Sequence, residues 1–249
     1  MPNTTNTKRN PATRSRVSIS ARRLAARTKR RIAWGAMALL AFGFALFSAR
    51  YFMFSEDVFP GFLRETYKAT SPIIYVHVLP GVIAMLLGPL QFLGVLRRAK
   101  YRRTHRVLGR MYVASCLVAA LGALWMATVA YGGLVTGLGL GALAVLWIGA
   151  TSLGTRAALI GNIAVHRRWM TRSFAMTFAI VMFRVEFELL QVFGMPRVLA
   201  YQLSAWGCWI INLAVTERFI LARATDGQAK LPVKRIDQPA AMVRVRPMS

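Results

Sequence analysis

Charged residues are scarce in this chain, and several familiar motifs are missing from it. Only 16% of the 249 residues are charged, against roughly 25% in a soluble domain. The chain has no Ser-His-Asp arrangement, His-Glu-x-x-His motif, phosphate-binding loop or paired Cys-x-x-Cys, so it carries no motif of a hydrolase, kinase or dehydrogenase. The two cysteines, Cys116 and Cys208, lie in apolar stretches at different expected depths, which argues against a disulfide. These absences leave open whether the protein is an enzyme.

Apolar residues are abundant and come in long blocks. They make up 56% of the chain, and the mean hydropathy is +0.45. Blocks of about 20 apolar residues match the length that crosses a bilayer core, and no alternating barrel pattern is present. The sequence therefore predicts an all-α integral membrane protein, with a fifth span that continues a helix starting near Ile163. The six predicted spans are residues 32–54, 71–96, 107–130, 134–160, 173–193 and 200–221.

The spans divide the chain into a membrane domain and two tails. We expect spans two to five to form a four-helix core, with spans one and six packed outside it. Residues 32–221 are then one six-helix transmembrane domain. Residues 1–31 are a basic tail with little expected structure, although their Arg-rich, acid-free composition is also typical of an organelle transit peptide. Residues 222–249 are a second basic tail.

The positive charge is distributed unevenly between the two sides of the predicted membrane domain. The formal net charge is +25, and the predicted topology places 28 basic residues on one side against four on the other. Basic residues favour the cytoplasmic side, so both termini are predicted to be cytoplasmic, with anionic lipids as partners of the basic face. Nucleic acid is a minor alternative, because the N-terminal tail has no aromatic residue on which a base could stack.

Several short motifs resemble those of a known family. They are His77, the run GPLQF at 88–92, HRVLGRMYV at 105–113, GNIAVHRRWMTRSFAMTF at 161–178, and Phe183 with Arg184. Together they resemble a bacterial family of predicted membrane proteins called domain of unknown function 2306, over about residues 72–190. The resemblance implies a membrane protein, and through the bacterial family an inner-membrane location. It implies no activity.

Two histidines, His105 and His166, form the first candidate site. Spans two to five make two hairpins that rotation about the membrane normal can relate, which would put both histidines at similar depth on the cytoplasmic side. They could then be the axial ligands of a haem b, or lie beside a quinone, a phosphate or another anionic ligand. The alternative is an anchor that binds lipid head groups at the membrane face. The arginines that would hold propionates or another anion are Arg106, Arg110, Arg167, Arg168 and Arg172.

Charged residues inside the fifth span form the second candidate site. Arg184 and Glu188 are four residues apart and are expected to pair on one helix face, which Gln191 extends, while Glu186 points elsewhere. With His77 from span two, this outer-leaflet group could bind a small ligand or relay protons, because charges at such depth are costly. The alternative is a structural ion pair that fixes helix packing.

Three functional hypotheses follow from these sites. The first is a non-catalytic membrane component that binds lipids or a partner protein, since packing and charge rules account for all the features. The second is a haem-binding or quinone-linked electron-transfer protein that uses His105 and His166. The third is a transporter or small-ligand-binding protein that uses His77, Arg184 and Glu188.

In span four, glycines at every fourth position, from Gly133 to Gly141, predict close helix packing.

Overall fold

The computed structural model describes the backbone of residues 11–228 and, within it, the side chains of 24–25, 28–29, 31–55 and 57–218. Every regular element in this range is a helix, which confirms the all-α fold. The long helices are α1 (Pro11–Ser48), α3 (Ser71–Gln91), α4 (Arg102–Ala127), α5 (Leu134–Leu159), α6 (Ile163–Thr177), α7 (Ala179–Val192) and α8 (Arg197–Gln228). The short helices are η1 (Ala49–Met53), η2 (Glu56–Val58), η3 (Gly61–Leu63), α2 (Arg64–Ala69) and η4 (Ala99–Tyr101).

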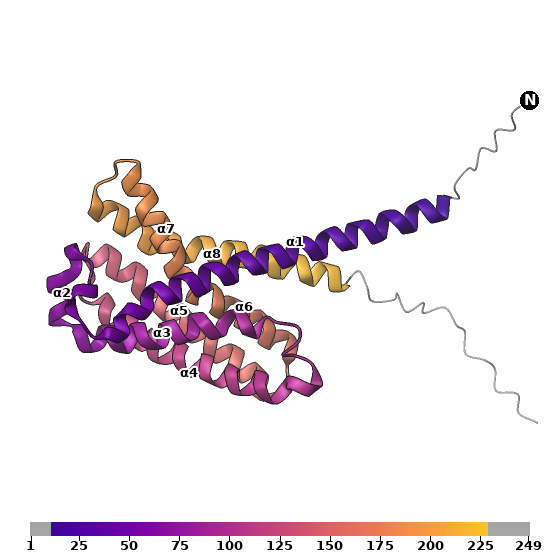
Figure 1. The fold of residues 1–249 in the computed structure, drawn as a ribbon, viewed down its shortest axis with the longest axis horizontal. Helices are drawn as coiled ribbons and strands as arrows, with labels where there is room; N and C mark the ends of the chain where they lie inside the picture. The colour runs from indigo at the N-terminus through magenta and orange to yellow at the C-terminus, as the bar shows by residue number, and fades with distance from the viewer. Residues whose placement is uncertain (1–10, 229–249) are drawn as a thin grey trace, which may run out of the picture.

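Helices α3, α4, α5 and α6 form the centre of the bundle, as expected for the predicted core (Figure 1). Helix α1 packs along α3, and α8 packs against α5, α6 and α7. Helix α8 is more than a peripheral addition, because Ala200, Ala205 and Cys208 on it are completely buried. We call the end of the bundle with residues 92–101 and 160–162 the basic end. The other end holds residues 54–70 and 128–133.

Five helices among the described residues are long and apolar enough to cross a membrane. They correspond to predicted spans one, two, three, four and six. Their side chains are mostly exposed on the bundle surface, as expected for helices that face lipid rather than water. The chain is therefore a polytopic helical membrane protein. The five segments are Arg31–Met53, Ser71–Gln91, Ala99–Ala127, Leu134–Leu159 and Arg197–Arg218.

The predicted fifth span is two helices rather than one, so the count of six continuous spans is not confirmed. Helix α6 begins at Ile163 as expected, but it ends at Thr177, and Phe178 is a turn residue before α7 begins at Ala179. With 15 and 14 residues, each helix is about 22 Å long, which is short of a bilayer core of ~30 Å. Asn212 on α8 donates from Nδ2 to the Ala175 carbonyl at 3.0 Å, a carbonyl that an unbroken helix would bond to residue 179.

The helix ends differ from the predicted boundaries of the membrane domain. Helix α1 begins at Pro11, so residues 11–31, expected to have little structure, are helical. The segment 12–34 has no Gly or Pro and is rich in Ala, Arg and Lys, which all favour helix. Helix α8 extends to Gln228, beyond the predicted end at 221. The outermost parts of both predicted tails, 1–10 and 229–249, lie outside the described residues.

The predicted glycine packing on α5 is present at Gly137 and Gly141, two of its three positions, and also at Gly139 between them. A Cβ at Gly137 would lie 2.5 Å from the Ala127 carbonyl oxygen, and one at Gly139 would lie 3.0 Å from the Ala205 carbonyl oxygen. A Cβ at Gly141 would make an ordinary contact with Ala127 at 3.7 Å. These glycines let α4 and α8 approach α5 closely. Gly133 differs, because it has φ +73° and open space around it, and it serves the turn before α5.

Candidate functional site

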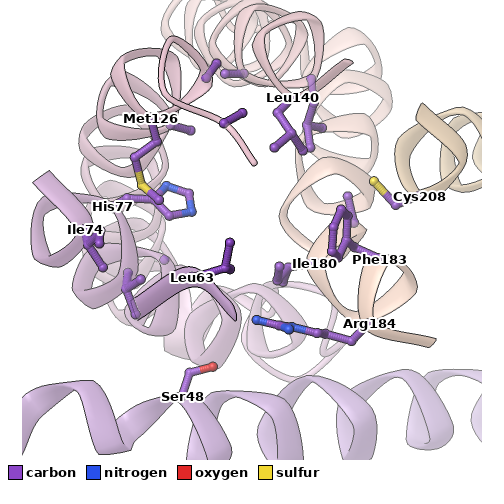
Figure 2. Close-up of a pocket in the computed structure, with 18 of the residues that line it drawn as sticks. Ser48, Leu63, Ile74, His77, Met126, Leu140, Ile180, Phe183, Arg184 and Cys208 are labelled. Carbon is purple, nitrogen blue, oxygen red and sulfur yellow. The ribbon is translucent and has the colours of Figure 1, made fainter. Parts of the chain in front are cut away.

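A cavity of about 210 Å³ lies inside the bundle on the side away from the basic end (Figure 2). Its walls come from α1 and from α3 to α8. Residues 61–70, which we call the roof segment, cover it. Most of the lining is apolar, so the few polar groups that face the cavity determine what it can hold. The polar lining residues include Ser48, Thr66, Tyr67, Thr70, His77, Tyr131, Thr177, Arg184 and Tyr201.

His77 on α3 presents one ring nitrogen to this cavity. Its Nδ1 lies 2.8 Å from the Ala119 carbonyl oxygen on α4, so Nδ1 carries the hydrogen and donates it. Nε2 is then the acceptor, and Figure 2 shows the ring directed into the open space. The absence of a side chain at Gly122 permits this contact, because a Cβ there would lie 3.0 Å from the His77 backbone nitrogen. The close approach of α3 and α4 therefore fixes both the ring orientation and its tautomer.

Arg184 on α7 enters the cavity from the opposite wall (Figure 2). Its Nε is buried and has no hydrogen-bond partner. Among the described side chains, no carboxylate forms an ion pair with Arg184. The hydroxyl groups of Tyr67 and Tyr201 are close enough to interact with its charge. Arg184 therefore brings a positive charge, without a counter-ion from the described chain, into a largely apolar space.

The predicted pairing of Arg184 with Glu188 is wrong for this structure. Glu188 is exposed and does not line the cavity, and no ion pair joins it to Arg184 within the described part of the chain. Arg184 precedes Glu188, and a helix pair with the basic residue N-terminal to the acidic one is the less favourable order at a spacing of four. A spacing of four residues permitted the pair but did not require it.

The other two polar residues of this predicted group also lie outside the cavity. Glu186 faces α8, where a Cβ at Gly207 would lie 2.5 Å from its Oε2, and its Oε1 is buried without a partner. Gln191 is half-buried, with an unpaired Nε2. Of the predicted outer-leaflet group, the cavity therefore contains His77 and Arg184 only.

Sequence reasoning missed the roof segment, which falls between the first two predicted spans and was given no role. Leu63 and Tyr67 both line the cavity from this segment. Burial raises the pKa of the Tyr67 hydroxyl well above its usual value, and the neighbouring Tyr201 raises it further. The neighbouring ring of Phe62 contacts Tyr131 and Tyr201 at centroid distances of 5.2 and 6.2 Å, so aromatic packing holds the segment in place. The aromatic residues of this loop were the available signal.

His105, near the start of α4, and His166, near the start of α6, both lie at the basic end. The two rings are close enough to interact electrostatically, and Arg97 also acts on His105. The Nδ1 of His166 donates to the Gly154 carbonyl oxygen at 2.8 Å, whereas the Nδ1 of His105 is buried without a partner. Neither histidine lines the cavity. Haem binding by this pair stays a prediction, and so does binding of a quinone.

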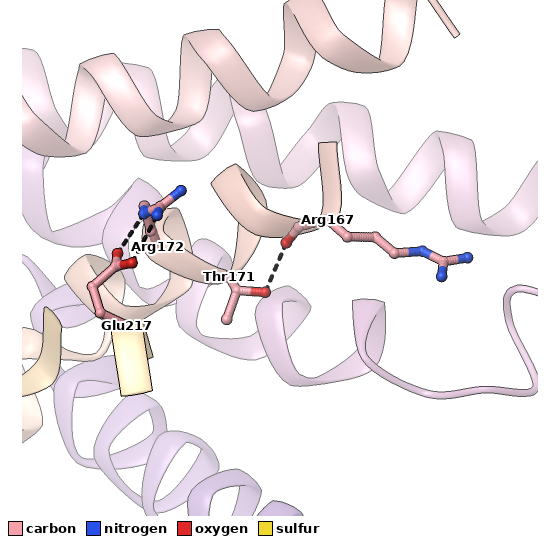
Figure 3. A network of polar contacts seen from close by, with 4 residues as sticks. All are labelled: Arg167, Thr171, Arg172 and Glu217. Carbon is pink, nitrogen blue, oxygen red and sulfur yellow. Dashed lines mark hydrogen bonds and ion pairs between the residues drawn. The ribbon is translucent and has the colours of Figure 1, made fainter. Parts of the chain in front are cut away.

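The predicted anion-binding arginines are not equivalent. Arg172 makes two hydrogen bonds to the Glu217 carboxylate, at 2.5 and 2.8 Å (Figure 3). Its guanidinium lies 4.6 Å from the centre of the Trp169 ring. Arg172 therefore joins α6 to α8, and its guanidinium is already paired with a carboxylate of the chain. The side chain of Arg167 extends away from this pair in Figure 3. The remaining three predicted arginines are exposed at the basic end, and they are Arg106, Arg110 and Arg168.

The fold and the internal cavity define a polytopic helical membrane protein with polar groups inside the bundle. The model of the family described as predicted membrane protein (DUF2306) matches residues 74–220, which is more than half of the chain. The chain belongs to this family, and the match extends the expected region through most of α8. No curated protein and no solved structure gave a match. The family establishes the class of protein and assigns no activity.

Proposed function

We propose that this membrane protein binds a small organic anion in the cavity, with Arg184 holding the anionic group and His77 accepting a hydrogen bond from the ligand or from a water beside it. The observation that carries the proposal is the Arg184 guanidinium, whose buried Nε has no partner in a mostly apolar cavity. This proposal develops the small-ligand hypothesis and uses two of its predicted residues.

The electrostatics of the cavity favour an anionic ligand over a neutral one. An uncompensated buried charge costs several kcal/mol, and a partner of opposite sign offsets that cost. No described carboxylate supplies this partner. The nearby hydroxyl groups of Tyr67 and Tyr201 add hydrogen-bonding capacity without adding a negative charge of their own.

The size of the cavity limits the ligand. An apolar cavity of about 150 Å³ holds benzene, and this one is about 210 Å³. There is room for one ring and a small charged group, which describes an aromatic carboxylate. Because the free ring nitrogen of His77 is an acceptor, a hydroxyl group on the ring would add a donor for it.

The test is titration calorimetry of the purified protein in a neutral detergent. Benzoate should bind, 4-hydroxybenzoate should bind more tightly, and benzyl alcohol should bind at least tenfold more weakly, because a charged hydrogen bond contributes about 1.5–3 kcal/mol. Arg184→Gln should weaken benzoate by at least tenfold. Arg168→Gln, which removes the same charge from the exposed surface, is the matched control. Equal benzoate binding by wild type and Arg184→Gln would show the proposal to be wrong.

The proposal includes an orientation in the membrane. Both termini lie in the cytoplasm of a bacterial cell, the basic end faces anionic lipids of the inner membrane, and α6 with α7 crosses as one broken span. The charge distribution supports this, because 28 basic residues then lie on the cytoplasmic side against four outside. The buried native cysteines, Cys116 and Cys208, allow introduced cysteines to be labelled selectively.

Labelling of intact cells with an impermeant maleimide tests this orientation. Thr128→Cys and Phe193→Cys replace exposed residues beside the turns after α4 and α7, and both should react from outside. Lys100→Cys at the basic end should react only after lysis. If Thr128→Cys is labelled and Phe193→Cys is not, α6 and α7 do not cross the membrane, and the protein has five spans instead of six.

A further inference from the structure

We infer that the basic end carries a second, separate binding site, built for a phosphate group and formed by His105 and His166 with Gln91, Arg97 and Arg167. It lies at the other end of the bundle from the cavity and does not depend on the function proposed for Arg184.

The two histidines occupy matching positions in two helices. His105 is the fourth residue of α4, and His166 is the fourth residue of α6. The hydrogen bond from His166 Nδ1 to the Gly154 carbonyl leaves its Nε2 free. His105 interacts with His166, and its own Nδ1 is buried and unpaired. The two imidazole rings are therefore near enough to interact electrostatically, and each has a ring nitrogen that no described residue satisfies.

Gln91 adds an unpaired donor to the same place. It is the last residue of α3, and its Nε2 is buried without a partner. Its Oε1 lies 3.5 Å from the position that a Cβ on Gly109 would take. Gly109 is one turn beyond His105 on the same face of α4, so the amide and the imidazole are neighbours. A buried donor without a partner is costly, and an acceptor placed between Gln91 and His105 would offset the cost of both.

The charge around these donors is positive. Arg97 is near enough to His105 for its positive charge to interact with the imidazole. The pKa of Arg97 is itself lowered, first by burial and then by the positive charge of Arg167. The sequence has no acidic residue between Glu65 and Glu186. Glu217, which does reach this end, is engaged by Arg172, and the Arg167 side chain extends away from that pair (Figure 3). Crowded cations without a carboxylate are stabilised by an anion.

The chemistry of the group fits phosphate better than a metal ion or a carboxylate. Among the described residues, no group of three or more metal-binding side chains exists, and the arginines would repel a cation. A phosphate offers several acceptor oxygens, enough for the Gln91 amide, two imidazoles and two guanidinium groups at once. The beginnings of α4 and α6 add partial positive charge at the same end. The phosphate comes either from a lipid head group or from free inorganic phosphate.

Two measurements on the full-length protein separate these sources. The first is calorimetry with inorganic phosphate in a neutral detergent. The second is native mass spectrometry after release from nanodiscs of phosphatidylglycerol and phosphatidylcholine, which counts the retained lipids. Wild type should bind inorganic phosphate, or should retain one phosphatidylglycerol in preference to phosphatidylcholine. The first result assigns the site to free phosphate and the second to a lipid head group.

The variants distinguish a built site from general attraction of charge. Gln91→Glu keeps the size of the side chain, gains an ion pair with Arg97 in place of the ligand, and should reduce binding at least tenfold. Arg97→Gln should have a similar effect, whereas Arg98→Gln, the neighbouring cation, should change binding less than twofold. Equal losses in Arg97→Gln and Arg98→Gln would overturn the proposal, as would the absence of binding from either source. A Soret band that is lost in His105→Ala and in His166→Ala would assign the pair to haem instead.

Discussion

The two ends of the bundle both contain arginine side chains, but they place them in different surroundings. At the basic end, Arg172 is half-exposed, paired with Glu217 and packed on Trp169. Inside the cavity, Arg184 is exposed to a similar extent, but its Nε is buried and it has no described counter-ion. A guanidinium paired with a carboxylate of the same chain holds two helices together. A guanidinium without such a carboxylate is stabilised by binding an anionic ligand. The following substitutions test this difference, and they are ordered by expected effect.

Arg184→Met should stabilise the ligand-free protein. Methionine fills similar space without a charge, and removing an uncompensated charge from an apolar site should raise the unfolding free energy by about 2 kcal/mol. The same variant should lose benzoate binding. Titration with a denaturing detergent measures the unfolding free energy. Glu188→Gln, at an exposed position on the same helix, should change it by less than about 0.5 kcal/mol. A less stable Arg184→Met would mean that the guanidinium has a structural partner.

Arg172→Met should lower the unfolding free energy, which is the opposite of the change expected for Arg184→Met. It leaves Glu217 without its two hydrogen bonds and loosens the contact between α6 and α8, which should cost about 1–2 kcal/mol. Arg168→Met, four residues earlier and exposed, is the control for the loss of a positive charge. The comparison of the two ends fails if Arg172→Met and Arg184→Met shift the unfolding free energy in the same direction.

Two glycines on α4 sharpen the comparison of packing at the two ends. Gly122→Ala, beside the cavity, places a Cβ 3.0 Å from the His77 backbone nitrogen and should cost about 1 kcal/mol. Gly109→Ala, near the basic end, makes an ordinary contact of 3.5 Å with the Gln91 side chain. Its gain in helix propensity should leave stability unchanged or raised by up to ~1 kcal/mol. The measurement is the thermal unfolding midpoint, and equal midpoints for both variants would contradict the packing described for α3 and α4.

The smallest expected effect is on the alkaline stability of the roof segment. The pKa of Tyr67 is raised in the folded protein, mainly by burial, so the folded state holds this proton more tightly than the unfolded state does. The resulting stability is fully present below the unfolded pKa of about 10 and is lost as the pH rises further. Tyr67→Phe should therefore lose less stability than wild type between pH 9 and about 11. If the unfolding free energies of wild type and Tyr67→Phe change with pH in parallel, the ionisation of Tyr67 does not contribute to stability.

Several features of the fold and of the basic end were predictable because they depend on local composition and topology. Five spans follow from length and hydropathy, and the position of His105 and His166 at the same end follows from the arrangement of two hairpins. The break at Phe178 was not predictable, because no Gly or Pro marks it. It depends instead on Asn212, which lies on a different helix.

The cavity was predicted only in part, because its lining depends on side-chain direction and on contacts between distant segments. His77 and Arg184 were found from the rule that intramembrane charges are costly. Whether Arg184 turns to Glu188 or to the cavity depends on contacts with other helices, which residue spacing does not encode. The contribution of Tyr67 requires the roof segment to fold back over the bundle, and no periodicity within that segment indicates it.

The break between α6 and α7 has a consequence for how the two proposed sites can change over evolutionary time. His166 and Arg167 stand on one rigid rod, and Arg184 stands on another, with a single residue at the joint. In one continuous helix, a substitution that rotates one end would rotate the other by the same angle. Where the helix is interrupted, a rotation of α7 need not pass into α6, so substitutions that retune the cavity can leave His166 and Arg167 in place.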